Sequence, residues 1–288
     1  MQLAEAVERF LRSLDGVKSA ATVKWYHRRL SALAAFLGQQ ETADVTTDDL
    51  RRWRATYNGR VSVWTLHGYV RAVRRLFRWL VDEGLLTDSP ARRLELPRLP
   101  EEPRKGISDN DRDKIIEAAR QTGPRDYALV LFLADTLCRV GGLVGLRVFD
   151  LDLDAGEALV HEKGDKSRTV FILDDTVDAL RAWLKERGDP GSHYVFTGKK
   201  GRLSTWGIYQ ILERLAKSAD VKRNWNPHNW RHGGARGMLQ RGASLGHVSQ
   251  ILGHSGIDVT NRFYGTFARS ELKAAHRKYG RRITPKDF

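Results

Sequence analysis

The chain has little cysteine and no long apolar run. Cys138 is the one cysteine among 288 residues, so the chain can form no internal disulfide and offers no cysteine-based metal cluster. Its longest apolar stretches, such as Ala128–Ala134, are far shorter than a membrane-spanning helix. The N-terminal residues MQLAEAVERFL carry acids where a secretory signal needs basic residues. We therefore expect a cytoplasmic protein that does not act on a membrane.

Acidic residues are outnumbered by basic ones along the whole chain. The sequence holds 49 Lys and Arg against 35 Asp and Glu, a formal net charge of +14. Residues 1–105 carry 19 basic and 13 acidic residues, and residues 106–288 carry 30 and 22. Because both halves are basic, the charge does not belong to a tail, and a polyanion that contacts both halves accounts for it economically. Nucleic acid is the favoured partner, and a merely basic surface is the alternative.

Proline is scarce, and its distribution divides the chain. Four of the eight prolines lie between Pro90 and Pro103. Proline lacks a backbone donor and disfavours helix in the residue before it, so this stretch is typical of a linker. We expect a helical domain at 1–96, a linker at 97–106 and a mixed domain at 107–288. Hydrophobic residues make up 41% of the chain, enough for a core in each domain.

The N-terminal piece has helical apolar spacing throughout. We predict helices at 4–14, from a cap at Thr22, after Thr47 and at 62–83. In the last of these, arginines recur at three- and four-residue spacing with no acid between positions 61 and 81. We expect this basic face to contact DNA phosphates, with a solvated surface as the alternative. Its members are Arg71, Arg74, Arg75 and Arg78.

The C-terminal piece mixes helices with short strands. Polar and apolar residues alternate at 157–161 and 168–173 around the turn sequence KGDKS, which predicts a β-hairpin with Lys163 and Lys166 at its tip. A further short strand is predicted at His193–Phe196. The whole chain is therefore expected to be mainly α with a small β-sheet. The helices predicted here are 108–119, 124–136, 175–187, 205–218, 229–241, 245–252 and 259–267.

The order of several polar residues carries more information than any one motif. A His-x-x-Arg match such as PHNWRH is expected by chance in a chain this rich in arginine, and LGHS is weak alone. Together with LADTLCRVGGLVGLRVFDLDL, EKGDKSRTVFI and LGHSGIDVTNRFY, however, it resembles the tyrosine recombinase (phage integrase) family, including its Xer-type members. The layout is also similar: a helical, SAM-like core-binding domain, a proline-bearing linker and a mixed α+β catalytic domain. The residues that carry the resemblance are Arg139, Lys163, His228, Arg231, His254 and Tyr264.

The chemistry of these residue types fits phosphoryl transfer. A phosphodiester attacked by a hydroxyl gains negative charge on its oxygens. Arg139 and Arg231 each offer a planar fork that matches two such oxygens. The sequence has no carboxylate cluster suited to a metal pair, so we expect neither a metal nor another cofactor. Tyr264 is the most plausible hydroxyl, although a phenol with a pKa of about 10 needs activation.

The resemblance implies the remaining roles. Tyr264 would attack the scissile phosphate and form a 3′-phosphotyrosyl link, so that strands rejoin without ATP. His228 would accept the phenol proton, Lys163 would protonate the departing 5′-oxygen, and His254 would donate a hydrogen bond to a non-bridging oxygen. Lys166, otherwise a DNA contact, is the alternative to Lys163.

Two further positions qualify this assignment. Tyr279 is the alternative to Tyr264, but it has no Gly-His pair at the right distance before it. Family members commonly carry an acid three positions after the first arginine, where this chain has Gly142. That acid would buttress the site, so its absence leaves the support of Arg139 unexplained.

The resemblance implies a site-specific DNA recombinase that clamps double-stranded DNA between its two domains. Such an enzyme works as a tetramer on two DNA sites, and accessory DNA-bending proteins are further candidate partners. Nothing before Ala4 predicts an additional arm-binding domain, which favours a simple Xer-like system. The alternatives are a type IB topoisomerase-like enzyme that relaxes DNA and an architectural DNA-binding protein that does not cut. The resemblance further implies that the tail 265–288 docks on a neighbouring protomer, with packing on its own domain as the alternative. The DNA target and the biological programme stay open.

Overall fold

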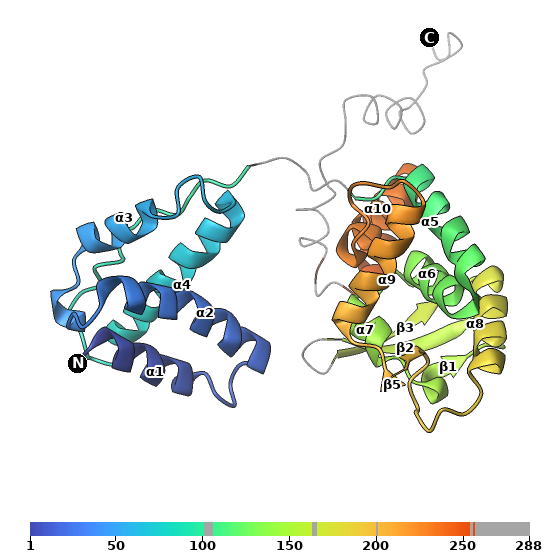
Figure 1. Cartoon of the computed structure of the whole chain (residues 1–288), viewed down its shortest axis with the longest axis horizontal. Coiled ribbons are helices and arrows are strands. Elements are labelled where there is room, and N and C mark those ends of the chain that lie inside the picture. Colours follow the sequence, from blue (N-terminus) through green and yellow to red (C-terminus); the bar gives the residue numbers. More distant parts are fainter. Residues whose placement is uncertain (101–105, 163–165, 200, 254–255, 257–288) are drawn as a thin grey trace, which may run out of the picture. The chain divides into compact units, whose positions relative to one another are not determined.

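The computed structural model describes residues 1–100, 106–162, 166–199, 201–253 and 256 (Figure 1). The chain divides into two compact units, Met1–Glu102 and Pro103–Phe288. The division lies within the stretch 97–106 for which the sequence predicts a linker. Within the described ranges, we find no helix that is both long and apolar enough to cross a membrane. The helix predicted at 259–267 lies outside the described residues.

The N-terminal unit is helical, as predicted, and its second, third and fourth α-helices begin at side-chain caps. The Ser19 hydroxyl accepts a hydrogen bond from the Thr22 N–H at 3.3 Å, so the second helix begins at Ala20 and the predicted cap at Thr22 is wrong. Ser62 caps the last helix in the same way, through the Thr65 N–H at 3.2 Å. The elements are α1 (Leu3–Ser13), α2 (Ala20–Leu37), the 3-10 helix η1 (Thr42–Asp44), α3 (Thr47–Ala55) and α4 (Val63–Asp82).

One apolar core holds these helices together. Helix α1 packs against α2 and α4, and α2 also contacts α3. Phe10 of α1 is fully buried, and its ring meets that of Tyr26 of α2 edge to face, with centroids 5.3 Å apart. Helix α4 buries the stripe that includes Val73, Leu76 and Leu80. Because that stripe faces the core, the arginines between its members point outward.

The C-terminal unit is mainly helical with a small sheet, which confirms the predicted fold class. Strands β1, β2 and β3 form an antiparallel sheet in that order. A second, two-stranded sheet pairs β4 with β5. The elements are α5 (Asp109–Thr122), α6 (Pro124–Thr136), α7 (Val140–Gly145), the 3-10 helix η2 (Val148–Asp150), β1 (Leu151–Asp152), β2 (Glu157–Glu162), β3 (Lys166–Phe171), α8 (Asp174–Arg187), β4 (Thr197–Gly198), β5 (Gly201–Arg202), α9 (Thr205–Ser218), α10 (Pro227–Gln240) and α11 (Leu245–Leu252).

Helix α6 forms the centre of this unit. It contacts α5, α8, α10 and β3, and its residues 128–133 are all buried. A helix that is apolar on all sides has to be surrounded by other elements. The helix ends at Leu137, which takes a left-handed conformation with φ 48°. The chain therefore turns sharply here and enters α7 at Arg139, beside β2.

Two adjacent glycines let α10 approach the rest of the unit closely. A Cβ built on Gly233 would lie 2.2 Å from the carbonyl oxygen of Ile107, and one built on Gly234 would lie 2.3 Å from Leu137 Cδ2. Real side chains do not fit at such distances, so only glycine permits this packing. The contact brings α10 against the corner between α6 and α7.

The predicted strand His193–Phe196 is wrong. Tyr194 makes only an isolated bridge to Arg147, and the paired residues come later, in β4. Val195 and Phe196 are nevertheless almost completely buried, and the Val195 N–H donates to the Leu146 carbonyl at 2.9 Å. The apolar pattern here reflects burial in the core, which periodicity alone does not distinguish from a strand.

Candidate active site and basic surface

Arg139 stands at the corner between α6 and α7, beside the end of β2. It is the N-cap residue of α7, and its backbone N–H donates to Glu162 Oε1 at 3.1 Å. Its guanidinium Nη1 forms an ion pair with the other carboxylate oxygen of Glu162. The Arg139 side chain is still 45% exposed. One side of its fork is held by the protein while the rest faces solvent.

Glu162 is a buried acid that receives positive charge from several directions. Its side chain is 4% exposed, and it also lies 3.4 Å from Nη2 of Arg168. Burial by itself raises the pKa of this carboxyl. The Arg139 N–H and the charges of Arg168, Arg139 and Arg231 outweigh burial, so the pKa of Glu162 lies below its ordinary value. The group is therefore an ionised carboxylate at neutral pH.

Arg168 extends this network to the end of α11. From β3, its Nη1 donates to the carbonyl oxygen of Ile251, in the last turn of the helix. A Cβ built on Gly253 would lie 2.5 Å from Arg168 Cδ, and Gly253 has φ 62°. Glycine is thus required for two reasons where the chain leaves α11. Gly253 immediately precedes the candidate catalytic residue His254 in the sequence.

Arg231, on α10, binds the ends of both α6 and α11. The residue is 5% exposed, and its Nη1 donates to the Leu137 carbonyl at 2.6 Å. Its Nη2 donates to the Leu252 carbonyl. Both carbonyls belong to helix ends, where the last C=O groups lack a partner within the helix and attract a cation. Since Leu137 precedes Arg139 by two positions, the structure brings the two arginines to one corner of the unit.

His228 lies in the first turn of the helix that carries Arg231. Asn226 caps this helix through the Asn229 N–H at 3.1 Å, and Pro227 occupies its first position. His228 is exposed, and its Nε2 lies 2.8 Å from Nε2 of His232, which is 7% exposed. One of these nitrogens must donate and the other accept, so His232 restricts the tautomer of His228.

Three of the six candidate catalytic residues, Lys163, His254 and Tyr264, lie outside the described residues, as does Tyr279. The backbone of Lys166 pairs with Glu162 in the hairpin. No group of three or more His, Cys, Asp or Glu side chains in the described part of the chain could hold a metal ion. Cys138 is buried, and burial raises the pKa of its thiol despite the nearby Thr136 hydroxyl, so it is not a thiolate at neutral pH.

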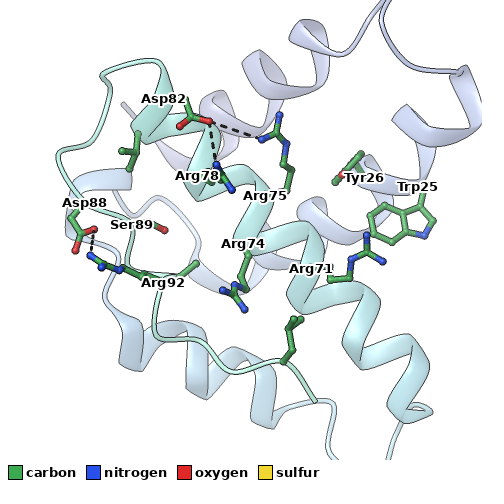
Figure 2. Close-up of a pocket in the computed structure, with 13 residues that line it drawn as sticks. Trp25, Tyr26, Arg71, Arg74, Arg75, Arg78, Asp82, Asp88, Ser89 and Arg92 are labelled. Atoms are coloured by element: carbon green, nitrogen blue, oxygen red, sulfur yellow. Dashed lines mark ion pairs between the residues drawn. The ribbon is translucent and has the colours of Figure 1, made fainter. Parts of the chain in front are cut away.

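A second basic feature lies on the N-terminal unit. The arginines of α4 line a hollow of about 640 Å³ together with Trp25, Tyr26 and Arg92, and Figure 2 shows them arranged along one side of that helix. We call this the α4 surface. Its arginines are Arg71, Arg74, Arg75, Arg78 and Arg92, and its acids are Asp82 and Asp88.

The α4 surface is less uniformly positive than the acid-free stretch between positions 61 and 81 suggested. Asp82 lies one residue beyond the acid-free stretch and is 4.0 Å from both Arg75 and Arg78. These side chains are all largely exposed, so the pairs are weak. Among the described residues, Arg71 and Arg74 have no ion-pair partner. Five arginines against two aspartates still leave the surface basic.

Sequence reasoning missed Glu162 and Arg168, although a signal for both was present. Ala158 and Val160 are the buried residues of β2, and Glu162 follows at the same period of two. Arg168 is paired with Val160 across the hairpin and therefore lies on the same face. A charged residue on the buried face of a strand needs a charged partner.

Comparison with protein families gives two matches. A family described as "Phage integrase family" matches residues 105–269, and "Phage integrase, N-terminal SAM-like domain" matches residues 7–84. A tyrosine recombinase XerC from Xanthomonas campestris pv. campestris (strain B100) is 32% identical over 264 residues, which cover 88% of this chain and 82% of that protein. A tyrosine recombinase XerC from Oceanobacillus iheyensis is 29% identical and covers 96% of each chain.

Solved structures give the same architecture. The crystal structure of XerA recombinase is 28% identical, with a TM-score of 0.56 over 98% of this chain and all of that one. XerH site-specific recombinase bound to difH substrate is 22% identical, with a TM-score of 0.72, and covers 93% of this chain and 82% of that one. A lambda integrase dimer bound to a COC′ core site is 16% identical, with a TM-score of 0.77, and covers 92% and 77%. The last two resemblances show a shared fold.

Proposed function

The chain belongs to the phage integrase family of tyrosine recombinases and is a site-specific DNA recombinase, and we propose that the corner formed by Arg139, Arg231 and His228 is its strand-cleavage site. The observation that carries this proposal is the arrangement around Arg139. A half-exposed guanidinium is anchored on one side by a buried carboxylate. Arg231 binds the adjacent end of α6 from helix α10, and the first turn of α10 carries His228.

The arginines would stabilise the charge that develops on the scissile phosphate. Attack by a hydroxyl produces a five-coordinate phosphorus whose non-bridging oxygens carry extra negative charge. The exposed part of the Arg139 fork can donate to two such oxygens, and its charge does not depend on pH. Removal of one preorganised donor of this kind costs about 3–4 kcal/mol, or about 10²–10³ in rate.

Tyr264 would supply the nucleophile. Its phenolic oxygen bonds to phosphorus, the bond from phosphorus to the 5′-oxygen breaks, and the DNA is held as a 3′-phosphotyrosyl ester. His228 would take the phenol proton, and Lys163 would give a proton to the departing 5′-oxygen. His254 would donate a hydrogen bond to a non-bridging oxygen. Rejoining is the reverse reaction, so the covalent link preserves the bond energy and no ATP is consumed.

The α4 surface would bind DNA phosphates from the N-terminal unit. Its outward arginines line a hollow that also contains the rings of Trp25 and Tyr26. Arginine forks suit phosphate oxygens, and contacts of this kind position a protein on DNA without reading the sequence. With Lys166 as a contact from the catalytic unit, both units would hold the duplex.

Assembly and location complete the proposal. We propose that the recombinase works as a tetramer on two DNA sites, in the cytoplasm, with accessory DNA-bending proteins as optional helpers. A lambda integrase tetramer bound to a Holliday junction has the same fold, with a TM-score of 0.74 at 17% identity. No observation favours a DNA-relaxing enzyme or a non-cutting architectural protein.

Covalent trapping tests the proposal and finds the DNA target in the same experiment. The purified chain is incubated with genomic DNA, denatured with detergent, and the protein-bound DNA is collected on filters and sequenced. We expect adducts at a defined sequence, in the presence of a chelator and without ATP. A nicked duplex made from that sequence then traps the intermediate quantitatively.

Two matched tyrosine variants identify the nucleophile. Tyr264→Phe should abolish the adduct while leaving DNA binding intact, and Tyr279→Phe should form adducts at the native rate. The reverse pattern would transfer the role to Tyr279. Failure of the native chain to form any adduct on its own recombination site would reject the proposed chemistry.

A further inference from the structure

The carboxylate of Glu162 is the direct neighbour of Arg139. It accepts a hydrogen bond from the Arg139 backbone N–H at 3.1 Å and forms an ion pair with its guanidinium. Among the described residues, the Arg139 guanidinium forms no hydrogen bond or ion pair with any other side chain. One carboxylate thus determines both where the Arg139 backbone turns and where its fork points.

Burial makes this contact more than a surface ion pair. The Glu162 side chain is 4% exposed, whereas exposed pairs contribute little because solvent screens them and both side chains lose freedom. A buried carboxylate that loses its partners carries a large desolvation penalty, so it holds those partners firmly. Arg168, which is 14% exposed, occupies the other side of the carboxylate.

Gly142, which has no side chain, lies next to the side chain of Glu162. Gly142 lies in α7, three positions after Arg139, and its N–H donates to the Arg139 carbonyl at 2.8 Å. A Cβ built there would lie 3.6 Å from Glu162 Cγ and 3.4 Å from Val160 Cβ. These are ordinary contact distances, so a side chain at 142 would begin in direct contact with the Glu162 side chain.

A carboxylate beside Arg139 can therefore be supplied by an acidic residue at position 142 or by one at position 162. We propose that Glu162 is the positioning residue for Arg139 in strand cleavage, in place of an acid at position 142. The same carboxylate also contacts Arg168, whose guanidinium holds the Ile251 carbonyl. Glu162 thereby links the position of Arg139 to the end of α11. The inference rests on the proposed function, since it assigns a role within the same site.

Three variants test this role. Glu162→Gln keeps the shape of the side chain and removes its charge, and Glu162→Gly removes the side chain. The double variant Glu162→Gly/Gly142→Glu supplies the carboxylate from position 142 instead. Glu157→Gln, at the opposite end of β2, is the matched control. The readouts are the rate of covalent adduct formation on a nicked substrate and, separately, the Kd for the same duplex.

We expect Glu162→Gln and Glu162→Gly to slow adduct formation by about 10–10²-fold, the range that a small misplacement of a reacting group produces. The Kd should change by less than about threefold, because the contacts that bind DNA remain. The double variant should form adducts at least about tenfold faster than Glu162→Gly does. A double variant no faster than Glu162→Gly, or a Glu162→Gln variant as fast as the native chain, overturns the inference.

A thermodynamic cycle shows whether Glu162 acts through Arg139. In an Arg139→Ala background, Glu162→Gln should have no further effect on the adduct rate, because the residue it positions is gone. Equal effects in both backgrounds contradict the proposed role.

Arginine side-chain NMR gives a readout that does not depend on catalysis. We expect slow rotation of the Arg139 guanidinium in the native chain and faster rotation in Glu162→Gln. Unchanged rotation overturns the positioning role even if the chain forms no adduct. A missing adduct with the expected NMR change rejects the proposed function alone.

Discussion

The guanidinium of Arg231 donates a hydrogen bond to the carbonyl oxygen of Leu137, 94 positions earlier in the chain, at 2.6 Å. Leu137 ends α6 in a left-handed conformation, and its carbonyl is one of the helix-end groups that lack an intrahelical partner. The same arginine binds the carbonyl of Leu252 at the end of α11. Arg231 is therefore a structural link between two helix ends as well as a candidate phosphate ligand.

This double role predicts that Arg231→Lys loses stability as well as activity. An ammonium keeps the charge but lacks the planar fork that reaches both carbonyls. We expect the free energy of unfolding to fall by about 2–3 kcal/mol, since a buried carbonyl is left unpaired. Urea unfolding measures the change. Arg241→Lys, exposed beyond the end of the same helix, is the control and should stay within about 0.5 kcal/mol.

The close packing of α10 predicts that Gly233→Ala damages the site from a distance. Its new Cβ would lie 2.2 Å from the Ile107 carbonyl oxygen, so the helix has to move and Arg231 moves with it. We expect a loss of about 1–3 kcal/mol and slower adduct formation. Gly141→Ala is the control, because a Cβ there meets nothing within 4 Å. Equal stability of the two variants would contradict the packing argument.

The capping box of α3 predicts a pH-dependent contribution to stability. The Thr46 hydroxyl and N–H, with Gln40 and Arg52, outweigh burial and hold the pKa of Asp49 well below its ordinary value. A depressed pKa in the folded state means that the stabilisation is present above the unfolded pKa of about 4 and is lost as the pH falls below it.

Asp49→Asn should therefore lower the free energy of unfolding by about 1 kcal/mol at pH 7, the usual contribution of a helix cap. The deficit should shrink between about pH 4 and pH 2, where the native carboxylate also loses its advantage. Urea unfolding at a series of pH values checks this. Asp48→Asn, whose side chain is 74% exposed in the same turn, should show neither effect.

The α4 surface predicts a specific salt dependence of DNA binding. Arg74→Gln should weaken binding to all sequences alike and reduce the slope of log K against log salt by about 1, because one phosphate contact is lost. Binding titrations at several salt concentrations measure the slope. Arg12→Gln, on α1 and away from the hollow, should leave it unchanged. A slope that does not differ between the two variants argues against phosphate contact at Arg74.

The sequence by itself determined most of the local structure. Helices α6, α9 and α11 have the predicted bounds, because Pro124, Ser204 and Ser244 are local start signals next to apolar periodicity. The hairpin of β2 and β3 followed from alternation around a turn sequence. The order of polar residues was also enough to indicate the family, since that order is visible without the fold.

Only the tertiary structure decided which residues meet. The sequence has Gly142 and no acid three positions after Arg139, and the partner of Arg139 proved to be Glu162, 23 positions away, because α7 packs against β2. Asp82, just beyond the stretch without acids, lies within ion-pair distance of an α4 arginine. Val195 and Phe196 are buried in the core, although residues 193–196 do not form the predicted strand. Caps and turns act over a few residues and can be recognised in the sequence. Ion pairs and close packing depend on distances between distant segments, which only the folded chain establishes.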